Sequence, residues 1–263
     1  MSVVVVRPVT SVRVLHSEWV KLRSLRSTAL TLLAAVGVMV ALGWLFGWGT
    51  QNQWSELRPD EKASFSPVDT TLAGFYLAQL AVGVLGVLLV TGEYATGMIR
   101  ATFGAVPRRL PVLWAKAVLY AAVTFALMLA ASFVAFVGGQ QLLGAHGTSL
   151  TGSGAVGAMV GVAGFLALIG VFSVALGFVV RSTAGGVATL FALLLVAPTL
   201  GLLLPASWRD HLLPYLPSNA GASFFSVHPS ADGLSPTAGL LVLVTWVVVA
   251  LLGAAVLVTR RDA

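Results

Sequence analysis

Residues 29–48 read ALTLLAAVGVMVALGWLFGW, an unbroken run without Asp, Glu, Lys or Arg. A helix of about 20 apolar residues, rising 1.5 Å per residue, crosses the roughly 30 Å hydrocarbon core of a bilayer. Five more stretches have the same character: residues 70–91, 112–137, 155–180, 183–204 and 237–259. In the stretch 112–137, the uncharged run begins at residue 117. The sequence therefore predicts an all-α integral membrane protein with six transmembrane helices, forming one domain over residues 29–259.

The composition of the whole chain agrees with this prediction. Only 9% of its 263 residues are charged and 58% are hydrophobic, whereas soluble domains contain about 25% charged residues. There is no cysteine, which excludes disulfides and thiolate metal sites. The basic residues lie beside the apolar runs rather than on a polar face, so the net charge of +6 reflects membrane orientation and not a nucleic-acid partner.

The distribution of Lys and Arg predicts the orientation of the six spans. With six spans, residues 1–28, 92–116, the turn at 181 and residues 260–263 lie on one side. They hold 12 of the 15 basic residues. The opposite loops hold only Arg58, Lys62 and Arg209. By the positive-inside rule we expect cytoplasmic N- and C-termini and a location in the cytoplasmic membrane of a bacterium.

The segment before the first span, VRVLHSEWVKLRSLR (residues 12–26), alternates apolar and basic residues at helical spacing. It predicts an amphipathic interfacial helix with its apolar face in lipid and its basic face toward anionic headgroups. The helix is either an orientation anchor or a docking surface for a partner. Between the last two spans, residues 205–236 contain five prolines and several aromatic residues. This composition favours short helical pieces at the outer interface over a structureless loop.

The chain lacks the residues that most membrane enzymes and ATPases require. All four histidines fall outside the predicted spans, HExxH is absent, and no lysine follows a glycine as a P-loop requires. Apart from Lys116 near the start of the third, the predicted spans contain no Asp, Glu, Lys, Arg or His, which weakens an ion-coupled carrier that relays protons through side chains. We therefore expect a protein that is not an enzyme and binds no cofactor, with any energy from ATP supplied by a separate polypeptide.

One charged island, TGEYATGMIRATFGAVPRRL (residues 91–110), separates the second and third spans. Its glycines and prolines predict a short cytoplasmic helix over about residues 93–103, with Glu93, Gly97 and Arg100 on one face. Glu93 in a first turn would suit the helix dipole as a cap or form a salt bridge. Alternatively, the short helix is a lever that a cytoplasmic partner grips.

Two segments carry a resemblance to a known family: HSEWVKLRSLRSTALTLL (residues 16–33) and GEYATGMIRATFGAVPRRLPVLWAKA (residues 92–117). They resemble the six-span permease subunits of ABC-2 type ATP-binding cassette transporters, particularly short actinobacterial ones. Met98 departs from the small polar residue expected there. The resemblance implies a coupling helix at 92–104 that contacts the ATPase, and a connecting helix at 12–26 beside it. The implied contact residues are Glu93, Tyr94, Gly97, Arg100 and Phe103 in the coupling segment, and Glu18, Trp19, Lys21, Leu22 and Arg23 in the connecting helix.

The resemblance also implies a dimer of permeases in the lipid bilayer, each bound to an ABC ATPase subunit that holds ATP and Mg. Two-fold symmetry makes a homodimer the simpler expectation. Gly43 and Gly47, and Gly157 and Gly161, form GxxxG pairs that permit close helix contact within or between chains. The uncharged spans favour an exporter of an amphipathic or hydrophobic substrate, such as a drug, an antimicrobial peptide or a lipid. A non-transporting membrane anchor and an ATP-independent carrier or channel remain as alternatives.

Overall fold

The computed structural model describes residues 10–24, 26–152, 154–227 and 233–261, and all regular secondary structure in these ranges is helical. Six helical segments among the described residues are long and apolar enough to cross a membrane. The prediction of an all-α, multi-pass membrane protein is therefore confirmed. Parts of the predicted termini, residues 1–9 and 262–263, lie outside the described residues, as does Leu25 of the predicted amphipathic helix.

The six spans are built from ten helical elements among the described residues. They are α2 (Arg26–Gln53), α4 (Pro67–Leu72) with α5 (Phe75–Ala95), α7 (Leu110–Leu143) with η1 (Gly144–His146), α8 (Ala155–Val180), α9 (Thr183–Phe191) with η2 (Ala192–Val196) and α10 (Ala197–Gly201), and α13 (Pro236–Arg260). The shorter elements are α1 (Ser11–Ser24), α3 (Pro59–Ala63), α6 (Met98–Ala105), α11 (Ala206–Leu212), η3 (Leu213–Tyr215) and α12 (Pro217–Phe225).

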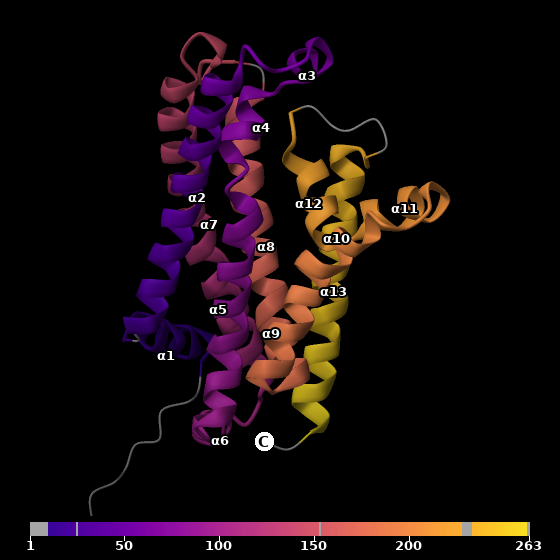
Figure 1. Ribbon diagram of the computed structural model, residues 1–263. Helices are drawn as coiled ribbons and strands as arrows, with labels where there is room; N and C mark the ends of the chain where they lie inside the picture. The colour runs from indigo at the N-terminus through magenta and orange to yellow at the C-terminus, as the bar shows by residue number, and fades with distance from the viewer. Residues whose placement is uncertain (1–9, 25, 153, 228–232, 262–263) are drawn as a thin grey trace, which may run out of the picture.

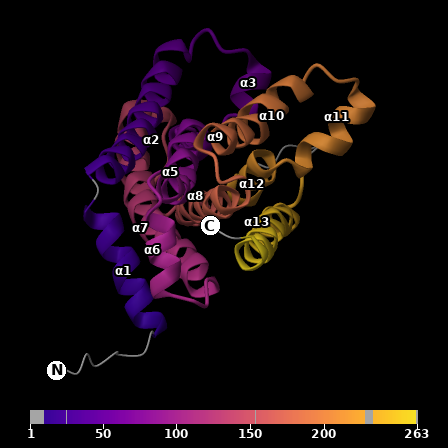
Figure 2. The same ribbon diagram turned by 90° about the horizontal axis from the view of Figure 1, so that it is seen from below.

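The spans form a bundle around α8, which packs against α5, α7 and α13. Within the apolar window of each span, 78% of α8 is buried, against 22% of α2 and of α13. Figure 1 shows α1 lying across one end of the bundle, with α6 and the C-terminus at that same end and α3 at the opposite end. Figure 2, seen from that end, shows α1, α6 and α7 close together.

Small residues allow α8 to sit at the centre. A Cβ atom added at Gly170 would lie 2.9 Å from the ring of Tyr120, and one added at Gly177 would lie 2.9 Å from Val90. Tyr120 is fully buried, and its hydroxyl donates a 2.6 Å hydrogen bond to the carbonyl of Val82. Close backbone approach at glycines is a recurrent way for membrane helices to pack.

Helix α7 is longer than predicted. The predicted third span ends at residue 137, but α7 continues to Leu143 through Gly138 and Gly139. Here the glycines serve packing rather than a turn, because a side chain at Gly138 would meet the ring of Trp44. Gln140 stabilises the extension, since its amide donates to the carbonyl of Pro67 at 3.0 Å and accepts from the Thr148 amide at 2.7 Å.

Pro198 interrupts the fifth span. Five residues of π-helix, Ala192–Val196, directly precede α10, in which Pro198 occupies the first turn. Because proline has no N–H, the carbonyl four residues earlier loses its helical partner. That carbonyl belongs to Leu194, and the hydroxyl of Ser218 in α12 donates to it at 3.2 Å. The irregularity at Pro198 is therefore stabilised by a contact from another element.

The region between α10 and α13 contains short helices, in agreement with the prediction for residues 205–236. Helices α11 and α12 and the 3₁₀ turn η3 occupy residues 206–225. Trp208 and Tyr215 expose 63% and 52% of their surface, and the carbonyl of Tyr215 accepts a hydrogen bond from the indole of Trp246 in α13. His228 and Asp232 of this predicted loop lie outside the described residues.

Candidate functional site

The turn between α5 and α6 differs from the single short helix predicted over residues 93–103. Helix α5 runs on to Ala95, and α6 starts only at Met98. Gly97 separates them with a φ of 72°, a left-handed conformation that glycine adopts without strain. Glu93 therefore lies in the last turn of α5 and not in the first turn of the short helix. Its stabilisation cannot come from a helix N-terminus.

Glu93 is instead part of a buried cluster of four charges. Lys116 of α7 donates to Glu18 Oε2 at 2.6 Å and to Glu93 Oε1 at 2.8 Å. Lys21 of α1 donates to Glu18 Oε1 at 2.7 Å, to Glu93 Oε1 at 3.1 Å and to Thr102 of α6 at 3.2 Å. We call Glu18, Lys21, Glu93 and Lys116 the charge cluster. Together with Thr102 it joins α1, α5, α6 and α7.

The charge cluster is electrically balanced and shielded from solvent. The side chains of Glu18, Glu93 and Lys116 expose 2%, 5% and 6% of their surface, and only Lys21 reaches 26%. Isolated buried charges are costly, but opposite charges in hydrogen-bond contact offset that cost. Glu93 lies in the last turn of α5 and Lys116 in the second turn of α7, near the ends of two helices that are long and apolar enough to cross a membrane.

The two cluster members on α1 show the electrostatic effect of the pairing. Burial opposes ionisation of Glu18, but the ammonium groups of Lys116 and Lys21 outweigh it and lower the pKa of this carboxyl. Burial likewise opposes the charged form of Lys21, but the carboxylates of Glu18 and Glu93 outweigh it and raise the pKa of the amine. Both groups are therefore charged over the whole neutral range.

Helix α1 turns one face into the protein. This buried face consists of Val14, Glu18 and Leu22, spaced four residues apart, and packs on α7. Val12 and Trp19, which the sequence placed on an apolar face in lipid, expose 74% and 41% of their surface and so lie away from the bundle. Glu18 lies on the buried face because its partner Lys116 belongs to α7.

The predicted contact residues divide into a buried and an exposed set. Ile99 and Phe103 bury one face of α6, and the guanidinium of Arg109 lies 5.4 Å from the Phe103 ring centre. Met98 and Arg100 of α6 are exposed, as are Trp19 and Arg23 of α1, while Gly97 forms the turn between α5 and α6. Leu22 is buried with Glu18. The exposed set can contact a partner, and the buried set connects the short helices to the bundle.

A second cluster at this end of the bundle holds the C-terminus of α13. Arg109 donates to the carbonyls of Val258 and Arg261 at 3.2 and 2.9 Å. Arg181 donates to the carbonyl of Leu257 at 3.1 Å and lies 5.1 Å from the ring centre of Tyr94. Cations at a helix C-terminus satisfy its free carbonyls and its dipole. The family resemblance implies that Tyr94 contacts a partner, whereas in the structure its ring is half-buried against this second cluster.

The two GxxxG pairs differ in their surroundings. A side chain at Gly43 would clash with the carbonyl of Thr71, and one at Gly47 would approach the carbonyl of Gly139 to 2.8 Å. Gly161 faces Phe225 of α12. These three glycines therefore pack within the chain. Gly157 has no atom within 4 Å of an added Cβ.

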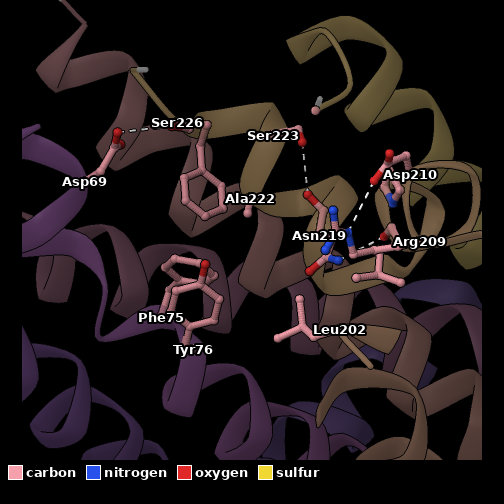
Figure 3. Close-up of a pocket in the computed structure, with 14 residues that line it drawn as sticks. Asp69, Phe75, Tyr76, Leu202, Arg209, Asp210, Asn219, Ala222, Ser223 and Ser226 are labelled. Carbon is pink, nitrogen blue, oxygen red and sulfur yellow. Dashed lines mark hydrogen bonds and ion pairs between the residues drawn. The ribbon is translucent and has the colours of Figure 1, made fainter. Parts of the chain in front are cut away.

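A cavity of about 530 Å³ lies at the opposite end of the bundle, between the start of α5 and the α11–α12 region. Figure 3 shows Phe75 and Tyr76 facing it from one side and Asn219 and Ser223 from the other. Asp69 borders the cavity and accepts hydrogen bonds from Ser226 Oγ at 3.0 Å and from the Val227 amide at 3.1 Å. Aromatic and polar groups thus share its lining.

No cluster of three or more His, Asp or Glu side chains suitable for a metal ion occurs in the described residues. Comparison of the sequence with models of known protein families finds no match, and neither does a search of curated proteins. Function is therefore argued from the geometry of the charge cluster and of α6.

Proposed function

We propose that this chain is the membrane-spanning permease subunit of an ABC-2 type ATP-binding cassette exporter. The observation that carries the proposal is the charge cluster, since it ties a short exposed helix, α6, to α1 and to two spans. A force applied to α6 by a partner is passed directly to α5 and α7 through charge-assisted hydrogen bonds, which are stronger than neutral ones.

The exposed residues of this end supply a docking surface for the partner. Arg100 and Met98 are exposed on α6, and Arg23 and Trp19 are exposed on α1. In the proposed complex, this end faces the cytoplasm, and an ATPase subunit that binds ATP and Mg contacts both helices. The permease chain itself hydrolyses no ATP, which accords with the lack of a P-loop sequence.

Transport in this proposal follows from alternating access in a permease dimer, with a homodimer as the simplest assembly. ATP-driven closure of the ATPase subunits would move α6, and the cluster would carry that motion into the bundle. The cavity beside Phe75, Tyr76 and Asn219 combines aromatic with polar groups. Such a lining favours an amphipathic or hydrophobic substrate, such as a drug, an antimicrobial peptide or a lipid.

The test is recovery of an ATPase with the chain from its native membrane. We expect wild-type chain extracted in mild detergent to retain a P-loop ATPase. Arg100→Glu with Met98→Glu should lose it, because both side chains are exposed and the added negative charges leave the core intact. Arg58→Glu next to α3, at the other end of the bundle, is the matched control and should retain the ATPase.

Three results would contradict the proposal. If no ATPase is recovered with the wild-type chain, the proposed transporter has no energy source, and a non-transporting membrane anchor would then be the better interpretation. Flux of substrate through reconstituted vesicles without ATP would favour a carrier or channel. Equal loss in Arg58→Glu would show that the exposed residues of α6 are not the contact.

A further inference from the structure

A second cavity, of about 340 Å³, lies beside the charge cluster, where α1, α2, α5 and α7 meet. One wall of it consists of leucines: Leu85, Leu88 and Leu89 from α5, and Leu119 from α7. Leu88 is 39% exposed, so the cavity reaches the lipid-facing surface of the bundle. The other end of the cavity is bounded by Glu93 and Lys116. It thus has an aliphatic wall and a polar end.

The polar end has one acceptor and one donor without a partner. Both oxygens of Glu18 accept, and Lys21 donates to three acceptors. Glu93 accepts twice through Oε1, whereas its Oε2 is buried and has no hydrogen-bond partner in the described residues. Within the described part of the chain, Lys116 donates two of its three N–H groups. Both Glu93 and Lys116 border the cavity, and Glu93 is 96% buried, since its exposed fraction is 4%.

The charge balance restricts what can fill this place. Two carboxylates and two ammonium groups sum to zero, so a ligand with a net charge would leave an uncompensated charge in a buried site. A neutral hydroxyl group has one O–H donor, and its oxygen can also accept. It would donate to Glu93 Oε2 and accept from Lys116 Nζ, which satisfies both unused groups at once. The leucine wall beside it favours an aliphatic chain.

We propose that this cavity binds a neutral amphiphile with a hydroxyl head, such as a long-chain alcohol or an acylglycerol, that enters from the bilayer. The hydroxyl contacts Glu93 and Lys116, and the chain lies along Leu85, Leu88 and Leu119. The site is independent of the proposed function, because neither ATP nor a partner contributes to it.

The experiment uses the full chain in lipid nanodiscs and a photoreactive decanol that carries a diazirine on its chain. After illumination, peptide mass spectrometry locates the label. We expect labelling within residues 85–96 of α5 or residues 27–31 of α2. Four competitors of equal chain length then test the head: 1-dodecanol, its methyl ether, dodecylammonium and dodecane. The alcohol should compete about tenfold better than the ether, because the ether cannot donate to the carboxylate.

A pair of variants tests the location. Thr31→Phe fills the cavity from α2, where Thr31 bonds only to the carbonyl of Ser27. It should abolish labelling at these residues. Leu30→Phe, on the exposed side of the same helix, is the control and should label like wild type. Equal competition by dodecane would show an unspecific lipid groove, and best competition by dodecylammonium would show a site for a cation. Either result, or wild type without label in these segments, overturns the proposal. If Thr31→Phe does not fold, the competitor series on wild type still decides.

Discussion

Replacing Lys116 by methionine removes the cation that contacts both buried carboxylates. Its Nζ lies 2.6 Å from Glu18 and 2.8 Å from Glu93, and its side chain is only 6% exposed. At an effective dielectric constant of 20, one such contact corresponds to a gross attraction of about 6 kcal/mol. Desolvation offsets much of this attraction in the wild type. In the variant, however, the carboxylates stay buried without the attraction, which typically costs about 3–5 kcal/mol.

The expected loss is larger than for the other cluster lysine. Lys21→Met should cost less than about 2 kcal/mol, since Lys21 is 26% exposed and water replaces part of the lost contact. A second change on the Lys116→Met background, Glu93→Gln, removes one of the two carboxylates that would otherwise share Lys21, and leaves Glu18 paired with Lys21. We expect this double variant to be more stable than Lys116→Met alone, because the remaining cluster is neutral again.

Free energies of unfolding in bicelles, measured by steric trapping, provide the comparison. Circular dichroism on each variant confirms that helix content is unchanged before unfolding. The argument is refuted if Lys21→Met costs as much as Lys116→Met. It is also refuted if Glu93→Gln lowers the stability of Lys116→Met further, because the second change would then remove a favourable group and not an uncompensated charge.

Three further predictions concern other parts of the molecule. Gly43→Ala should lower stability by about 1–3 kcal/mol in the same assay, because its Cβ meets the Thr71 carbonyl, whereas Gly37→Ala on the same helix has open space and should be neutral. Asp69→Asn keeps only one of two acceptors, and should speed hydrogen exchange of the Val227 amide by about tenfold or more without changing exchange in α8. The pKa of Glu18 is lowered, so the stability that this carboxylate contributes is complete above the ordinary value of 4.5 and is lost as pH falls through the lower folded value. The pKa of Lys21 is raised, so the stability that this ammonium group contributes is complete below 10.5 and is lost as pH rises through the higher folded value. The melting temperature should therefore be flat between these limits and fall on both sides, with a shallower acid limb in Glu18→Gln.

The six spans could be predicted from composition alone, because crossing hydrocarbon requires long uncharged runs whatever the helices pack against. The fourth span illustrates this: its predicted bounds, 155–180, coincide with those of α8. The end of α7 could not be predicted in the same way. Gly138 and Gly139 resemble turn residues in sequence, and only the neighbouring Trp44 and Gly47 show that they serve close packing.

The candidate site was predicted in part. Glu93, Glu18 and Lys21 were each singled out, and a salt bridge was one interpretation of Glu93. Lys116 was missed as a site residue because it lies 98 residues from Glu18 in the chain, and nothing in local periodicity links the two. The buried face of α1 was missed for the same reason. Hydrophobic spacing indicated which face lies toward lipid, but it gave no sign that Glu18 is buried against Lys116 of α7.

A buried charge cluster is a poor means of stabilising a bundle, because well-packed apolar residues of the same volume are often as stable or more stable. What it supplies is specificity of position. Apolar contacts tolerate small rotations of α1 against α7, whereas each member of the cluster has partners only at one rotation and one register. Four elements are fixed by it at once, and three of them, α1, α6 and the end of α5, meet at the exposed end of the bundle. The single acceptor left unused, Glu93 Oε2, lies at the border of a cavity open to lipid. A ligand bound there would contact the same carboxylate that holds α1 and α7, so occupation of the cavity and the position of the short helices are coupled through one side chain.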